Sequence, residues 1–194
     1  MDSFEYNGSP VRVLFGSGRR TKLPEELERL SLQKPLLVST PGQLEKAMEL
    51  VAILAESSIT VTCTFSKAAM HTPTSVTKEA LEHAQHSHAD SIVSIGGGSA
   101  IGLGKAISIR TGLPHVAVPT TYAGSELTPI LGETEDGRKM TWSDPGLLPC
   151  TVIYDVSYTL DLPSELSAVS GVNAIAHAGK FFETGLRLSV QLAH

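Results

Sequence analysis

The chain has 194 residues, with 15 Lys+Arg against 20 Asp+Glu and a net charge of -5. The absence of a basic surplus argues against nucleic-acid binding. Hydrophobic residues make up 41% and charged residues 18%, which excludes disorder and provides one buried core. No window approaches the run of about 18 apolar residues that a membrane span needs, and the first residues lack the features of a signal peptide. We therefore expect a soluble, cytoplasmic protein without a membrane partner.

Strand-like and helix-like segments alternate through the first two thirds of the chain, as in βαβ units. Expected strands lie at residues 11–15, 35–39, 59–65, 91–95, 116–118 and 152–154, and expected helices at 22–32, 41–57, 72–88 and 99–111. A polar turn at Asp136-Gly137 predicts an inserted hairpin. The continuous apolar run at 36–38 is typical of a strand buried on both faces of a parallel sheet. The pattern predicts a Rossmann-like three-layer α/β domain over residues 1–160.

Residues 161–194 form a separate, mainly helical segment in this prediction. Its apolar side chains need a partner surface, so we expect a homo-oligomer that forms through this C-terminal helix.

A glycine-rich segment, Gly96–Ser99, lies between an expected buried strand and an expected helix. Glycines at such a turn let backbone N–H groups approach a phosphate, and the helix N-terminus adds partial positive charge. The segment does not match GxGxxG, because Ile101 takes the place of the third glycine, and it is not a Walker A loop, because Lys105 is followed by Ala106. A pyrophosphate site is favoured over a merely tight strand-to-helix turn.

A hydroxyl-rich loop, residues 119–126, follows the next strand and so lies at the same carboxyl edge of the sheet. The hydroxyls of Thr120, Thr121, Tyr122 and Ser125 are suited to bind a ribose, a phosphate or a substrate carboxylate. The alternative is that they satisfy their own backbone within the loop.

These two segments, together with the run Ser170–Ala178, resemble the iron-containing alcohol dehydrogenase superfamily over approximately residues 10–178. Within it, the maleylacetate reductases are the most similar. Two marks of that branch are Gly102, where metal-dependent members usually carry Asp, and Asn173, where the metal-binding Asp would be.

The resemblance implies a dehydroquinate synthase-like N-terminal domain, followed by a helical C-terminal domain, with NADH or NADPH in the cleft between them. The cofactor-binding residues that it implies are Ser39, Thr40, Gly96, Gly97, Gly98, Ser99, Thr120, Thr121 and Leu127. Tyr122 and His177 are the candidate catalytic residues, as a donor and a general acid or base. No acidic residue follows the second strand, so both nucleotides are expected to bind.

The superfamily members continue well beyond the segment that ends at Ala178, so the helical domain is expected to be truncated here to a short remnant. Asn173 and His177 lie four residues apart on one helical face, but Asn is a poor ligand for iron or zinc. Cys63 and Cys150 have no metal-type spacing and are expected to be free thiols. No metal is therefore expected.

Three functions remain open at this point. The first is a maleylacetate reductase-like oxidoreductase that uses NAD(P)H to reduce an activated enone or carbonyl of a small acidic or aromatic-derived substrate. The second is a redox-inactive biosynthetic isomerase, dehydratase or cyclase that uses the old nucleotide cleft. The third is a non-catalytic truncated homologue. Binding of a nicotinamide nucleotide discriminates the first from the others.

Overall fold

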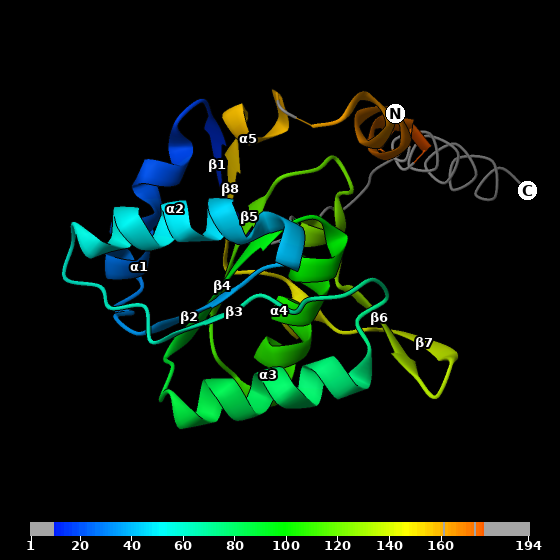
Figure 1. Cartoon of the computed structure of the whole chain (residues 1–194), viewed down its shortest axis with the longest axis horizontal. Coiled ribbons are helices and arrows are strands. Elements are labelled where there is room, and N and C mark those ends of the chain that lie inside the picture. The colour runs from blue at the N-terminus through cyan, green and yellow to red at the C-terminus, as the bar shows by residue number, and fades with distance from the viewer. Residues whose placement is uncertain (1–9, 161, 173, 177–194) are drawn as a thin grey trace, which may run out of the picture.

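The computed structural model of the chain describes residues 10–160, 162–172 and 174–176 (Figure 1). Its centre is a six-stranded parallel sheet with the order β1-β8-β5-β4-β2-β3. The strands are β1 (Arg12–Gly16), β2 (Pro35–Val38), β3 (Cys63–Phe65), β4 (Ser91–Gly96), β5 (His115–Pro119) and β8 (Thr151–Asp155). The predicted α/β fold with a parallel sheet is confirmed.

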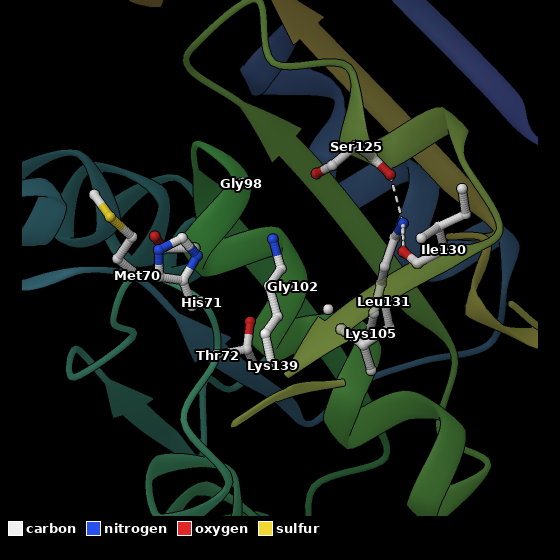
Figure 2. Close-up of a pocket in the computed structure, with 12 residues that line it drawn as sticks. Met70, His71, Thr72, Gly98, Gly102, Lys105, Ser125, Ile130, Leu131 and Lys139 are labelled. Carbon is white, nitrogen blue, oxygen red and sulfur yellow. Dashed lines mark hydrogen bonds between the residues drawn. The ribbon is translucent and has the colours of Figure 1, made fainter. Parts of the chain in front are cut away.

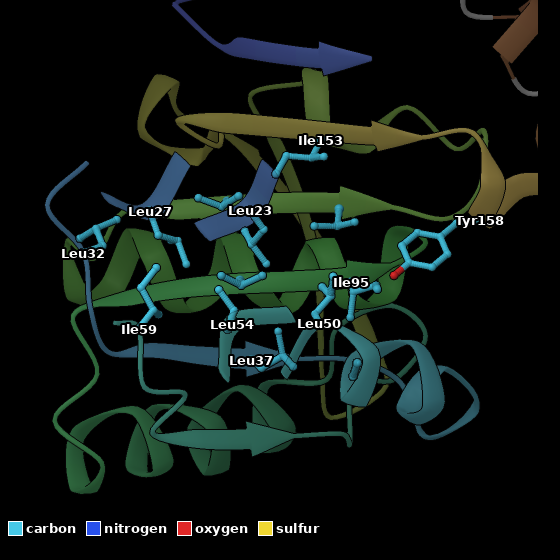
Figure 3. Close-up of a cluster of buried hydrophobic side chains, with 14 residues drawn as sticks. Leu23, Leu27, Leu32, Leu37, Leu50, Leu54, Ile59, Ile95, Ile153 and Tyr158 are labelled. Atoms are coloured by element: carbon cyan, nitrogen blue, oxygen red, sulfur yellow. The ribbon is translucent and has the colours of Figure 1, made fainter. Parts of the chain in front are cut away.

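Helices cover both faces of this sheet. They are α1 (Leu23–Arg29), α2 (Leu44–Ala55), α3 (Thr74–His86) and α4 (Gly98–Thr111), with a short α5 (Ser157–Leu160) after β8. Leu37 of β2 packs with Leu27 and Leu54 from α1 and α2 (Figure 3), whereas the preceding Leu36 packs with Leu103 and other residues of α3 and α4. Successive side chains of a strand point to opposite faces, so the three layers follow from this alternation.

The strand β3 is shorter than the run expected at 59–65. The amides of Thr60 and Thr62 still donate to the carbonyls of Gln33 and Pro35, at 2.9 and 3.2 Å. Pro35 has no N–H group to donate in return, so a regular parallel ladder begins only at the pair Leu36–Cys63.

The predicted hairpin is confirmed as β6 (Ile130–Glu135) and β7 (Arg138–Ser143), paired in antiparallel register. Asp136 and Gly137 at its tip have positive φ angles of 48° and 75°, as a two-residue turn with the twist of the strands requires. Arg110 of α4 donates to Glu133 of β6 at 2.8 Å, which fastens the hairpin beside α4 (Figure 1).

Residues 164–172 and 174–176 are helical. Leu166, Val169, Val172 and Ile175 within these ranges are exposed. His177 and the rest of the predicted C-terminal helix lie outside the described residues, and the oligomer and the domain boundary at residues 160–161 stay predictions. Among the described residues, no helix combines the length and the apolar character that crossing a membrane requires.

Candidate nucleotide-binding site

The turn between β4 and α4 leaves the N-terminus of a 14-residue helix uncapped by any side chain. Strand β4 ends at Gly96, Gly97 is extended at the N-cap position, and α4 begins at Gly98. The first N–H groups of a helix have no partner within the helix, and its dipole places partial positive charge there. This end of α4 is therefore suited to bind an anion.

The three glycines at residues 96–98 differ in what an added Cβ atom would contact. Gly96 has a φ of 142°, and a Cβ there would lie 3.0 Å from the Cβ of Ala100. A Cβ on Gly97 would lie 3.0 Å from both Cγ2 and Oγ1 of Thr121. A Cβ on Gly98 would meet only the Ser125 hydroxyl oxygen, at 4.0 Å. The fold thus requires the first two glycines, whereas Gly98 keeps open the space in which a ligand approaches.

Buried polar atoms without a partner surround this turn. They include Oγ1 of Thr120, Oγ of Ser125 and Oε1 of Gln43. The Thr120 amide donates to the Gly96 carbonyl at 3.0 Å, and Cγ of Gln43 lies 3.8 Å from the Cβ position of Gly96. Leaving such atoms unpaired costs free energy, and a bound polar ligand would satisfy them. A phosphate-bearing nucleotide fits these residues.

One side chain of the hydroxyl-rich loop at residues 119–126 forms a hydrogen bond within the loop. Thr121 Oγ1 accepts a hydrogen bond from the Ala123 amide at 3.4 Å, as the alternative interpretation of this loop predicts. The hydroxyls of Thr120 and Ser125 have no such partner. The Thr121 hydroxyl is thus bonded within the loop, whereas the ligand-binding interpretation stays a prediction for Thr120 and Ser125.

A cavity of about 310 Å³ opens beside the first two turns of α4 (Figure 2). It is lined by Met70, His71, Thr72, Gly98, Ser99, Gly102, Lys105, Ser125, Ile130, Leu131, Gly132 and Lys139. His71 and Lys139 bring a titratable and a cationic side chain into it from the loop before α3 and from β7 (Figure 2). Neither residue was predicted from the sequence. The only sequence signal for Lys139 is its place in the predicted hairpin.

Gly102 lets Thr72 pack closely against α4 in the wall of this cavity. A Cβ on Gly102 would lie 2.6 Å from Oγ1 of Thr72, which is buried and has a positive φ of 45°. An Asp side chain at this position would not fit without movement of Thr72.

The same glycine turn faces a second cavity of about 540 Å³, formed by Gly97, Gly98, Thr121 and Ala123 together with Leu166, Val169, Ser170, Val172 and Ala176. A third cavity of about 460 Å³ is lined by Tyr122, Glu126, Tyr154, Asp155 and neighbouring, mostly apolar residues. Tyr122 is 43% exposed and does not line either of the two cavities at the turn.

Glu126 in the third cavity is buried, and one of its carboxylate oxygens accepts a hydrogen bond from the Tyr154 hydroxyl at 2.7 Å. Its other oxygen, Oε2, is buried without a partner. Burial, together with the charge of Glu126, raises the pKa of Tyr154.

The remaining predicted cofactor residues lie at other places along the sheet edge. Ser39 is buried at the end of β2, and its hydroxyl donates to Ser66 Oγ at 2.9 Å. Thr40 follows it at the N-cap of the short 3-10 helix Pro41–Gln43, and Leu127 is 45% exposed at the end of the 3-10 helix Ser125–Leu127 before β6. None of these three residues lines the cavities at the glycine turn.

Within the described ranges, no group of three or more His, Cys, Asp or Glu side chains is placed to hold a metal ion. Cys63 and Cys150 are free thiols, as predicted. Asn173 and His177 lie outside the described residues, so the structure does not test their expected arrangement.

Comparison with known proteins places the chain in a family. The family model for iron-containing alcohol dehydrogenase matches residues 10–156. Maleylacetate reductase from Rhizobium sp. (strain MTP-10005) is 50% identical over 180 residues, which are 93% of this chain and 50% of that protein. The maleylacetate reductase from Sphingobium indicum is 48% identical over 175 residues, 90% of this chain and 49% of that protein.

Solved structures agree with this result. The crystal structure of maleylacetate reductase from Agrobacterium tumefaciens superposes with a TM-score of 0.87 at 48% identity, covering 92% of this chain and 50% of that one. NADH-dependent butanol dehydrogenase A from Thermotoga maritima superposes with a TM-score of 0.82 at 25% identity, covering 91% of this chain and 50% of that one. The chain spans about half the length of the relatives that it matches, and it belongs to the iron-containing alcohol dehydrogenase family.

Proposed function

We propose that this chain binds NADH or NADPH at the β4–α4 turn and takes part in the reduction of a small, acidic enone or carbonyl substrate of the maleylacetate type. The observation that carries the proposal is the uncapped N-terminus of α4, with the unpartnered buried hydroxyls of Thr120 and Ser125 beside it. The relatives named maleylacetate reductase and the NADH-dependent butanol dehydrogenase support the substrate class and the cofactor class.

The residues of this chain supply binding and orientation. The amides of Gly98 and Ser99 would donate to the pyrophosphate, and Lys139, from β7, would neutralise part of its charge. Ser39, Thr40 and Gln43 would hold the adenosine part of the nucleotide. No carboxylate is present at residues 39–43 to repel a 2′-phosphate, so both nucleotides bind. The bound nucleotide supplies the hydride, and the protein fixes its position relative to the substrate.

Calorimetric titration with NADH and with NADPH tests the proposal. The wild-type protein is expected to bind both, and Gly98→Val is expected to abolish binding because its side chain fills the space where the phosphate approaches. The fold is expected to tolerate this change, because a Cβ added at Gly98 would meet only the Ser125 hydroxyl oxygen, at 4.0 Å.

Thr111→Val is the matched control. Thr111 lies exposed at the opposite end of α4, and its hydroxyl donates to the carbonyl of Ile107 and accepts from the amide of Leu113, both near that end. It is expected to bind like the wild type. Absence of binding of either nucleotide to the wild type at millimolar concentration would contradict the reductase and favour a redox-inactive enzyme that uses the same cleft.

A further inference from the structure

Lys105 is the largest fully buried side chain of the described residues, and its ammonium group lies among backbone carbonyls rather than in solvent. It donates to the carbonyl of Thr128 at 2.6 Å, and to those of Ser125 at 2.5 Å and Ile130 at 3.1 Å, the two bonds that Figure 2 shows. An ammonium group has three donors, and all three are used. This cation therefore fastens the whole segment 125–130 to helix α4.

The burial of this charge is costly and needs a compensating role or partner. Burial lowers the pKa of Lys105 to about 8, while the negative charge of the nearby Glu126 acts in the opposite direction. A neutral apolar side chain would fill the same space without this cost.

The loop that Lys105 fixes forms one wall of the proposed cofactor site. Lys105 lies two helical turns beyond Gly98, so the side chain joins the loop to the same rigid helix whose N-terminus binds the phosphate. The result is that Ser125 Oγ, buried and without a partner, lies 4.0 Å from the Cβ position of Gly98.

We propose that Lys105 is a positioning residue, which holds the hydroxyl of Ser125 against the first turn of α4 so that this hydroxyl binds the phosphate group of the nucleotide. The inference rests on the proposed function, because it concerns the same site. Lys105 also lines the cavity, but its ammonium group donates to the carbonyls of Ser125, Thr128 and Ile130, so in this proposal it acts through the path of residues 125–130.

The test is a double-mutant cycle on the full chain, with the dissociation constant of NADH as the readout. Ser125→Ala and Lys105→Met are each expected to weaken NADH binding by about tenfold. The double variant is expected to bind no more weakly than Lys105→Met, since the hydroxyl is already misplaced in that variant. If the increases in the NADH dissociation constant from the two single variants multiply in the double variant, Lys105 does not act through Ser125, and the inference is overturned.

Arg110→Met is the matched control. Arg110 also lies on α4 and also joins this helix to the hairpin region, through Glu133, but it does not line the cavity. It is expected to lower the melting temperature and to leave NADH affinity unchanged. An equal loss of affinity in Arg110→Met and Lys105→Met would show a merely structural role for Lys105.

Hydrogen exchange of the wild-type protein gives a second readout that does not depend on the folding of a variant. NADH is expected to slow exchange of the amides at residues 125–128. NADH binding without this protection would contradict the inference but not the proposed function. A wild type that does not bind NADH would overturn both, so the two failures are distinguishable.

Discussion

Arg20 and Asp155 form an ion pair that joins the turn after β1 to the end of β8. Nη1 of Arg20 donates to the buried carboxylate at 2.8 Å, and the backbone amides of Arg20 and Gly18 donate to the same carboxylate, each at 3.0 Å. Asp155 also lines the cavity that contains Tyr122. The Asp155 carboxylate thus links the segment after the edge strand β1 to the end of β8, and it also forms part of the wall of that cavity.

The first prediction concerns acid stability. Burial alone would raise the pKa of Asp155, but the hydrogen bonds from Arg20 and Ser157 together outweigh it and lower this pKa to about 2. The folded-state pKa lies below the unfolded value of about 4, so the stabilisation is present above pH 4 and is lost as the pH falls toward 2. The loss in free energy of unfolding is roughly 2 kcal/mol, measurable by urea titration at several pH values.

Asp155→Asn is expected to lower the free energy of unfolding at pH 7 by about 3 kcal/mol and to remove most of this acid dependence. Glu25→Gln is its control, because the Lys22–Glu25 pair is exposed and contributes less than about 1 kcal/mol. Equal effects of the two substitutions would contradict the assignment.

The second prediction concerns the contact between Gly104 and His115. A Cβ on Gly104 would lie 2.5 Å from Nε2 of the buried His115, which in turn lies 2.7 Å from Ser94 Oγ. Gly104→Ala is therefore expected to destabilise the protein by about 1–3 kcal/mol in a thermal or urea melt. Gly42→Ala, at a position with open space around it, is expected to be neutral. A neutral Gly104→Ala would show that β5 moves freely relative to α4.

The third prediction concerns the cation in the first cavity. Lys139→Met is expected to weaken NADH binding by about tenfold, the loss that follows from one charge-assisted hydrogen bond of about 1.5 kcal/mol. Arg138→Met is the control, because Arg138 precedes Lys139 on β7 and does not line the cavity. Calorimetry at two salt concentrations checks both, and the wild type should lose more affinity with added salt than Lys139→Met. The same salt dependence in both proteins would exclude a direct contact with the phosphate.

The fourth prediction concerns Tyr122, which lines a different cavity from the phosphate-binding turn. If its hydroxyl donates a proton to the substrate, Tyr122→Phe lowers kcat for reduction of maleylacetate about a hundredfold and changes NADH affinity less than about twofold. The decrease in nicotinamide absorbance and a calorimetric titration measure the two quantities. An unchanged kcat would exclude Tyr122 from the chemistry.

Local sequence signals determined much of this architecture. The alternation of apolar segments predicted the parallel sheet, and Asp136-Gly137 predicted the hairpin, because both depend on periodicity or on the backbone preference of single residues. Gly96–Ser99 identified the strand-to-helix turn for the same reason. Backbone conformation is encoded within a few residues.

The sequence predicted that the loop 119–126 lies beside that turn, whereas the tertiary structure decided which other side chains surround it. His71 and Lys139 reach one cavity from segments that are far apart in the sequence, and Gln43 approaches Gly96 from the end of β2. Lys105, on a helix face that periodicity could not assign, is buried and binds the carbonyls of a loop. Such contacts depend on how the helices and the hairpin pack on the sheet. A local sequence pattern does not predict them, because the partners of each side chain come from distant segments.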